Sequence, residues 1–217
     1  MLPNTQYSKY GPDWCSEMID ELNGTAFRIG IESDRKRRGS AVNVEVFDPR
    51  EDQHLFVLCV RKSEFRPGRF TRVCKDYFLC GRNENGNVFA HPVRVNSISA
   101  KVEVALCRIW SVTPSLLKRI VRQGDCGLVP ELKMNFSDVD RFDVREFTTD
   151  DGSHLITSDR VYVSRDCKKV YVNGSVSIRH LKSQHPFVAV TLPSSVLYRV
   201  QLGLRVVTWG FAAPTAD

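Results

Sequence analysis

Apolar and polar residues alternate along most of the chain, which is the pattern of half-buried β-strands. Such segments, rich in Val, Ile, Phe and Thr, follow one another over residues 26–110 and again over residues 126–202. The last segment of the first group, residues 98–110, is predicted to be a strand like the others. Asn173-Gly174 is the strongest hairpin signal in the chain. The pattern predicts a mostly β protein, built as an antiparallel barrel or sandwich assembly.

Two short stretches have the apolar spacing of a helix instead. Residues from about 13 to 23 carry an apolar stripe that ends at Asn23-Gly24, and residues 114–123 begin at a proline and stop before Gly124. We therefore expect two short helices. The second helix would link a β-rich N-terminal module, residues 1–123, to a β-rich C-terminal module, residues 124–217. One continuous domain is the alternative, because no low-complexity linker marks a boundary.

The composition narrows the class of protein. The 217 residues are 42% hydrophobic and 26% charged, which excludes disordered, collagen-like and coiled-coil proteins. The seven cysteines form no CxxC pair and are odd in number, which favours reduced thiols over a disulfide framework. No apolar run approaches the roughly 18 residues that span a bilayer, and the first residues lack the apolar part of a signal peptide. We expect a cytoplasmic protein with no membrane partner.

The formal net charge of +6 is mild, but the cations are clustered and arginine dominates the clusters. The planar guanidinium group suits phosphate, and interleaved aromatic residues such as Phe65, Phe70, Tyr77 and Phe78 can stack on unpaired bases. The clustered cations are Arg35, Lys36, Arg37, Arg38, Arg61, Lys62, Arg66, Arg69, Arg72, Lys118, Arg119 and Arg122. The leading hypothesis is a non-catalytic module of a larger assembly that binds RNA or a single strand. Solvated turns and core aromatics are the alternative interpretation.

A second hypothesis starts from Gly124-Asp125-Cys126-Gly127, where a nucleophile lies between glycines. This element resembles the nucleophile motif of viral chymotrypsin-like cysteine proteases. The resemblance implies a double β-barrel with the chain order His, acid, Cys, and His54, Asp76 or a nearby acid, and Cys126 keep that order. In this hypothesis Cys126 is the nucleophile and His54 the base. The alternative is a helix C-cap and turn that lead into a buried strand, with Cys126 as a core residue.

Three of the five histidines lie late in the chain, at His154, His180 and His185. Val176, Ile178 and His180 share one face of a predicted strand, so His180 is expected to point inward. If the three imidazoles converge, they can bind Zn²⁺ or another divalent ion and leave a position for water. Surface or core histidines without a metal are the alternative.

No nucleotide cofactor is expected, because the chain has no Walker A or dinucleotide fingerprint. A third function class, a protein-interaction subunit, rests on the acidic residues 131–151 as a docking loop for a basic partner.

Overall fold

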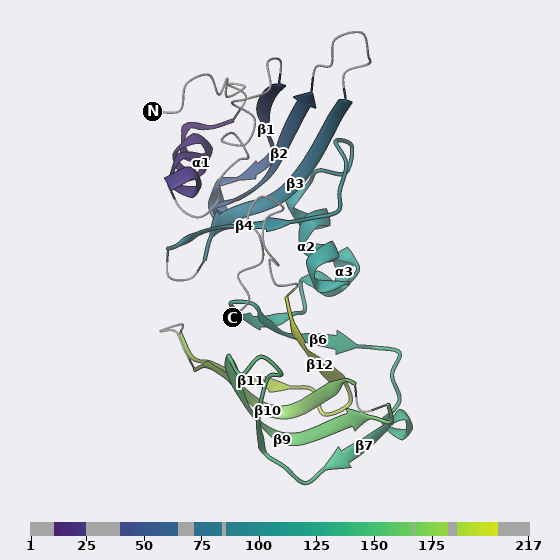
Figure 1. Cartoon of the computed structure of the whole chain (residues 1–217). Helices are drawn as coiled ribbons and strands as arrows, with labels where there is room; N and C mark the ends of the chain where they lie inside the picture. The colour runs from purple at the N-terminus through teal and green to yellow at the C-terminus, as the bar shows by residue number, and fades with distance from the viewer. Residues whose placement is uncertain are drawn as a thin grey trace. The chain divides into compact units, whose positions relative to one another are not determined.

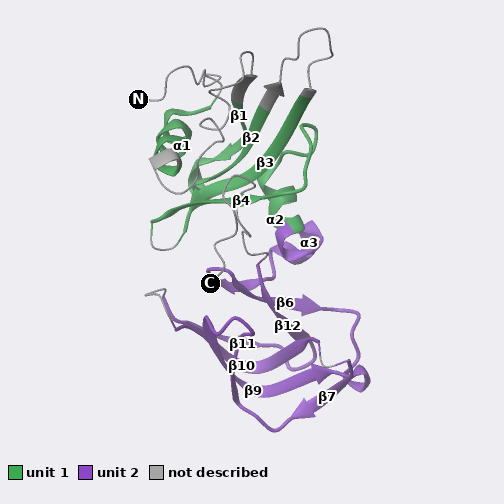
Figure 2. Ribbon diagram, viewed as in Figure 1, with its two compact units in different colours: residues 1–108, 206–217 green, residues 109–205 purple. Residues whose placement is uncertain are grey.

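The chain forms two compact units, which Figure 2 shows in different colours. The computed structural model describes residues 11–24, 40–64, 72–83, 86–166, 168–181 and 186–203. Unit 1 comprises residues 1–108 and 206–217, and unit 2 comprises residues 109–205. The division expected from the sequence, between residues 123 and 124, falls inside unit 2.

The residues of unit 1 that the structure describes include one antiparallel sheet of four strands (Figure 1). The strands follow each other in the sheet as they do in the chain, and each pairs with the next. Their bounds are Ser40–Arg50 (β1), Leu55–Glu64 (β2), Arg72–Arg82 (β3) and Val88–Pro92 (β4). A turn of 3-10 helix, Glu51–Gln53, joins β1 to β2. This antiparallel meander confirms the strands predicted from the alternation of apolar and polar residues in this part of the chain.

Helix α1, Asp13–Gly24, confirms the first predicted helix and packs its apolar side on the sheet of unit 1. Its buried residues Met18 and Ile19 belong to the same cluster as Phe56 and Leu58 of β2. Val57 and Cys59 point to the opposite face and are equally buried. Both faces of β2 are therefore covered, which is why its sequence is an almost continuous apolar run.

Residues Val102–Trp110 form helix α2, so the strand predicted over residues 98–110 is wrong. The β-branched residues of this segment suggested a strand, but Val102, Ala105 and Ile109 recur at helical spacing and are all buried. The side chain of Asp48 accepts the backbone N–H of Val102 at 2.9 Å. A carboxylate from distant β1 thus satisfies the first turn of the helix, which local propensity does not reveal.

In the described part of unit 2, eight antiparallel strands form one open sheet (Figure 1). The order is β5-β6-β12-β10-β9-β7, with β11 paired to β10 and β8 paired to β9. The bounds are Val121–Gln123 (β5), Cys126–Glu131 (β6), Val139–Phe142 (β7), Glu146–Thr148 (β8), His154–Ser164 (β9), Val170–His180 (β10), Val188–Leu192 (β11) and Leu197–Leu202 (β12). A 3-10 turn, Phe136–Asp138, precedes β7. The sheets do not close into a barrel, so the sandwich-like antiparallel assembly is the predicted architecture that fits.

The second predicted helix is present but short. Helix α3 covers Pro114–Leu117 only, and Val121–Gln123 pairs with residues 126–128 as strand β5. Gly124 and Asp125 form the two-residue turn between β5 and β6, and Gly124 has the positive φ of 55° that such a turn requires. This segment is therefore a hairpin turn and not the end of a helix.

Asn173-Gly174 is not a hairpin turn, contrary to the prediction. It lies within the continuous strand β10, where Gly174 and Ser175 stand opposite the single residue Asp159 of β9. This is a β-bulge, and Gly174 adopts a φ of 79° there. At the same point the neighbour of β10 changes from β12 to β11. The positive φ that favours glycine is present at this position, but it belongs to a bulge within a strand and not to a hairpin turn.

Candidate metal centre

Two histidines face each other at the end of the β9–β10 pair. His154 is the first residue of β9, His180 is the last residue of β10, and the register places them directly opposite. Side chains alternate along both strands, so His154 lies on the same inner face as Ile156, and His180 on the same face as Ile178. The sequence prediction that His180 points inward with Ile178 is consistent with this register.

Asp125 reaches the same place from the turn between β5 and β6. This turn is held to the end of β12, because Gly203 donates its N–H to the carbonyl of Asp125 at 2.5 Å. Strand β6 pairs with β12, and β12 pairs with β10. Because β12 lies between β6 and β10, the turn before β6 lies near the histidines at the end of β9 and β10, although Asp125 is far from both in sequence.

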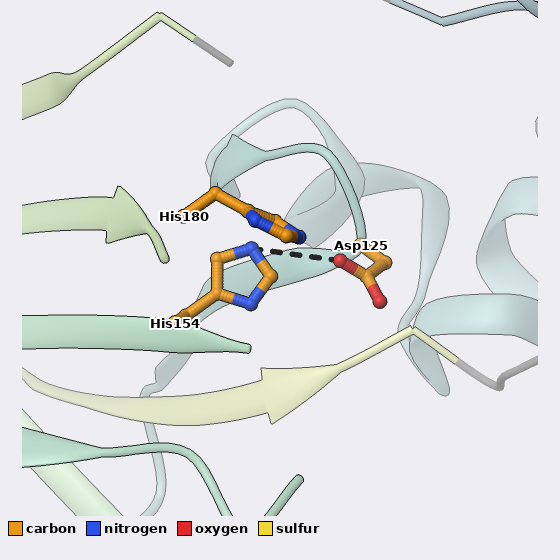
Figure 3. A group of neighbouring side chains, drawn as sticks. All are labelled: Asp125, His154 and His180. Atoms are coloured by element: carbon orange, nitrogen blue, oxygen red, sulfur yellow. Dashed lines mark ion pairs between the residues drawn. The ribbon is translucent and has the colours of Figure 1, made fainter. Parts of the chain in front are cut away.

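The three side chains converge on one point, as Figure 3 shows. One ligand atom from each of Asp125, His154 and His180 lies within 4.8 Å of the other two. The imidazole rings of His154 and His180 meet edge to face, with centroids 4.5 Å apart. Nε2 of His154 lies 3.5 Å from a carboxylate oxygen of Asp125. Two nitrogen donors and one oxygen donor thus face a common centre.

The 3.5 Å separation distinguishes two kinds of contact. A charge-assisted hydrogen bond between nitrogen and carboxylate is about 2.7–2.9 Å long, so this pair is wider than a good hydrogen bond. Two ligands bonded to one ion at about 2.1 Å in tetrahedral directions lie about 3.4 Å apart. The separation of this one pair is therefore close to that of two ligands on a shared ion, whereas the three ligand atoms together lie within a wider limit of 4.8 Å.

The loop between β8 and β9 holds the other nitrogen of His154. Ser153 Oγ lies 2.8 Å from His154 Nδ1, and the same hydroxyl donates to Asp151 at 2.5 Å. Asp151 also accepts the backbone N–H of Ser153 and the hydroxyl of Thr149. A ligating histidine typically has such a partner on its second nitrogen.

The site is buried on one side and open on the other. His154 is fully buried, whereas 46% of the Asp125 side chain is exposed and His180 is half-buried. An ion at this point would have three protein ligands from the described residues and a side that solvent can reach. Structural zinc sites have four protein ligands, whereas catalytic zinc sites have three and leave one coordination position open to water or substrate.

Of the three predicted histidine ligands, the structure brings two together. His154 and His180 are neighbours, and His185 lies outside the described residues, so its role stays a prediction. Asp125 was not predicted as a ligand. A signal for it was present, because Gly124-Asp125 reads as a two-residue hairpin turn and places the carboxylate at the end of a sheet.

The predicted phosphate-binding cations are divided between the two units. Arg61, Lys62 and Arg72 lie on β2 and β3 of unit 1, where Arg61 stands opposite Lys75. In unit 2, Lys118, Arg119 and Arg122 are exposed. The predicted cations outside the described residues are Arg35, Lys36, Arg37, Arg38, Arg66 and Arg69. Of the aromatic residues expected to stack on bases, Tyr77 and Phe78 are buried. Nucleic-acid binding stays a prediction.

The geometry offers no support for a nucleophilic Cys126. Its side chain is fully buried in the core of unit 2, and burial raises the pKa of its thiol to about 12. A reactive cysteine needs a lowered pKa and access to substrate. His54 belongs to unit 1 and ends the 3-10 turn before β2. These features of Cys126 do not favour the cysteine hydrolase, but they do not test it, and it stays a prediction. The protein-interaction subunit also stays a prediction.

The remaining findings concern the chain as a whole. The six cysteines in the described ranges are free thiols. Within those ranges, no helix has both the length and the apolar character needed to cross a membrane. Comparisons of the chain with protein-family models, with curated proteins and with solved structures give no match.

Proposed function

We propose that unit 2 binds one divalent transition-metal ion through Asp125, His154 and His180 and presents it to solvent. The observation that carries this proposal is the convergence of three ligand atoms within 4.8 Å. These atoms come from three different strand ends, so only the folded sheet brings them together. For all three to bond one ion, the exposed Asp125 and the half-buried His180 have to rotate toward His154.

The donor set selects the class of ion. Imidazole nitrogens suit Zn²⁺, Fe²⁺, Ni²⁺ and Cu²⁺, whereas Mg²⁺ and Ca²⁺ prefer sites made of oxygen. Three protein ligands leave room for water, whose pKa a bound Zn²⁺ lowers to about 7. The function that this arrangement favours is metal-centred chemistry on a small, solvent-accessible substrate group, with Asp125 at the accessible side.

Zinc titration of the full chain tests the proposal. We expect one equivalent of Zn²⁺ to bind in isothermal titration calorimetry, and we expect Mg²⁺ not to compete. D125N, H154N and H180N each remove one ligand, and each variant should lose at least tenfold in affinity. H54N is the matched control, because it removes an exposed histidine of unit 1. A wild-type chain that binds no Zn²⁺, or ligand variants that bind as tightly as H54N, would overturn the proposal.

Binding of a nucleic acid is a second candidate function, favoured by one specific observation. Lys118, Arg119 and Arg122 lie within five residues of one another, are all exposed, and form no ion pair with any residue that the structure describes. Arg122 stands opposite Gly127 on β6, which has no side chain to cover it. Unpaired cations close together favour a polyanion over isolated acidic groups.

The salt dependence of binding tests this second candidate. We expect single-stranded RNA to bind with an affinity that falls steeply between about 50 and 200 mM salt. The triple variant K118A/R119A/R122A should weaken binding and reduce the slope of log affinity against log salt by about two. The control K133A/R141A/R160A removes three exposed cations elsewhere in unit 2. Equal losses in both triple variants, or no binding at low salt, contradict the assignment.

A further inference from the structure

The carboxylate of Asp151 organises the loop that leads into His154. It accepts hydrogen bonds from the backbone N–H of Ser153 at 3.1 Å, from the Ser153 hydroxyl at 2.5 Å and from the Thr149 hydroxyl at 2.5 Å. The Thr149 oxygen in turn accepts the backbone N–H of His154 at 3.1 Å. One carboxylate therefore fixes both the main chain of His154 and the hydroxyl beside its ring.

The direction of these hydrogen bonds determines where the proton of the His154 ring lies. An ionised carboxylate only accepts, so the Ser153 hydroxyl must donate its single proton to Asp151. The Ser153 oxygen can then only accept from His154 Nδ1, which lies 2.8 Å away. Nδ1 consequently carries the proton. In the neutral ring the lone pair is then on Nε2, the atom that lies 3.5 Å from Asp125.

We propose that Asp151 and Ser153 are positioning residues that hold His154 in the one tautomer able to bind a metal through Nε2. This inference rests on the proposed metal site and deepens it. A metal ligand needs a lone pair pointing at the ion, and the hydrogen bond on the other nitrogen selects which nitrogen has it. Asp151 and Ser153 contact no ion themselves, and they act through His154.

Replacing Asp151 by Asn should reverse the proton order. The backbone N–H of Ser153 keeps the amide oxygen on its own side, so the amide NH₂ faces the Ser153 hydroxyl. The Ser153 oxygen then accepts from that NH₂ and donates to Nδ1 of His154. The ring proton moves to Nε2 and points at Asp125, where it blocks the ion. S153A has a weaker effect, because it removes the partner of Nδ1 without imposing the other tautomer.

The chain contains a matched control at the opposite end of β9. Ser164 donates its hydroxyl to Asp166 at 2.5 Å, with the same spacing of two residues and a similar burial of the serine. The pKa of the Asp166 carboxyl is lowered, chiefly by this hydrogen bond. Among the residues that the structure describes, no histidine is bonded to Ser164. S164A and D166N therefore remove the same kind of interaction from the same strand and leave His154 untouched.

Two measurements on the full chain test the proposal. Long-range ¹H–¹⁵N spectra of the metal-free protein at pH 8 should show His154 protonated at Nδ1 in the wild type, at Nε2 in D151N, and as a mixture in S153A. Zinc affinity should fall by about 10- to 100-fold in D151N and by less in S153A. Both readouts should be unchanged in S164A and D166N.

The outcomes separate the two proposals. A wild-type chain that binds no Zn²⁺ overturns the metal site, and with it the role of the two positioning residues. If Zn²⁺ binds but D151N retains the wild-type affinity and the Nδ1 proton, only the positioning role is overturned. If the control variants lose as much affinity as D151N, the effect is one of strand stability and the positioning role is likewise wrong. The spectrum distinguishes these cases, because loss of stability alone does not move the proton.

Discussion

Unit 1 and unit 2 are both antiparallel β structures, but they bury different side chains. Within the described ranges, every buried polar side chain lies in unit 2: Gln123, Thr149, Ser153, His154, Ser158, Ser164 and Asn173. Unit 1 buries aromatic and aliphatic residues together with thiols, such as Cys15 and Cys80. Burial raises the pKa of Cys15 to about 12, so this thiol stays neutral like its neighbours. Unit 1 is an apolar core around a sheet.

The buried polar groups of unit 2 lie where the sheet changes. Ser158 and Asn173 lie at the bulge, where the Ser158 hydroxyl donates to the carbonyl of Asn173. Gln123 ends β5 and donates to the carbonyl of Pro186. Thr149, Ser153 and His154 form the loop at the candidate site. Burying a polar group is unfavourable unless a partner compensates it, so such groups are kept where geometry depends on them. We therefore expect unit 1 to contribute mainly stability, and we expect the proposed metal site, if it is occupied, to place the chemistry in unit 2.

The largest expected effect is on the core of unit 1. Phe56 is fully buried and packs edge to face on Trp14, with ring centroids 5.7 Å apart. F56A should lower the free energy of unfolding of unit 1 by about 3–5 kcal/mol, because it removes buried apolar surface and leaves a cavity in the cluster between α1 and the sheet. F56L is the milder variant, which keeps most of the volume. Hydrogen exchange measures each unit separately.

This variant also tests whether the units are energetically separate. If unit 1 contributes stability alone, amides of β9 and β10 keep their protection in F56A, and zinc affinity stays at the wild-type value. Equal loss of protection in both units would contradict the division of roles.

The regular part of the fold was predictable from the sequence, because it depends on local periodicity. The strands of unit 1 follow the alternation of residues 41–95, and α1 follows its apolar stripe. Helix α2 was missed because its β-branched residues mask a helical spacing, and because its first turn is satisfied by Asp48 from another strand. The bulge at Gly174 was missed because a left-handed glycine serves a turn or a bulge equally well.

The candidate site was predictable only in part, for a similar reason. His180 follows from strand parity, since it lies on the face of Ile178, and its pairing with His154 needs only the β9–β10 register. Asp125 depends on the order β6-β12-β10, which joins strands far apart in the chain. The motif around Asp125 drew attention to Cys126 instead, and this residue belongs to the core.

The second effect is expected in unit 2 and comes from the metal. An ion that binds only the folded state at 100 times its dissociation constant stabilises that state by about 2.7 kcal/mol. Zn²⁺ should therefore slow the hydrogen exchange of β9 and β10 amides by roughly 100-fold where exchange requires opening of unit 2. Amides of β2 and β3 should not respond. D125N is the control, because it removes a half-exposed ligand and leaves the buried core intact.

Zinc that protects both units equally would show that the ion stabilises the whole chain. Protection that persists in D125N would place the ion elsewhere. Either result would break the assignment of the chemistry to unit 2 through this site.

The smallest expected effect is a pH dependence of unit 1, carried by His91. This residue lies on β4, opposite Leu79 of β3, and burial lowers the pKa of its imidazole. The folded state thus favours the neutral ring, while the unfolded chain binds a proton near pH 6.5. The stabilisation is present above that pH and is lost as the pH falls through the lower folded-state value. H91Q has no imidazole to protonate, so its unfolding midpoint in urea should fall less between pH 7.5 and 5.5 than that of the wild type.

The measurement is made in metal-free protein, with hydrogen exchange of β3 and β4 amides as the reporter, so that the histidines of unit 2 do not contribute. H54N is the control, because His54 is exposed and asparagine tolerates the left-handed backbone that this position adopts, with a φ of 50°. An acid response in H91Q as large as in the wild type would mean that the half-buried ring of His91 is not responsible. In that case another titratable group of unit 1 would cause the acid response. The contrast between the apolar core of unit 1 and the polar groups buried in unit 2 would then be smaller than the buried side chains indicate.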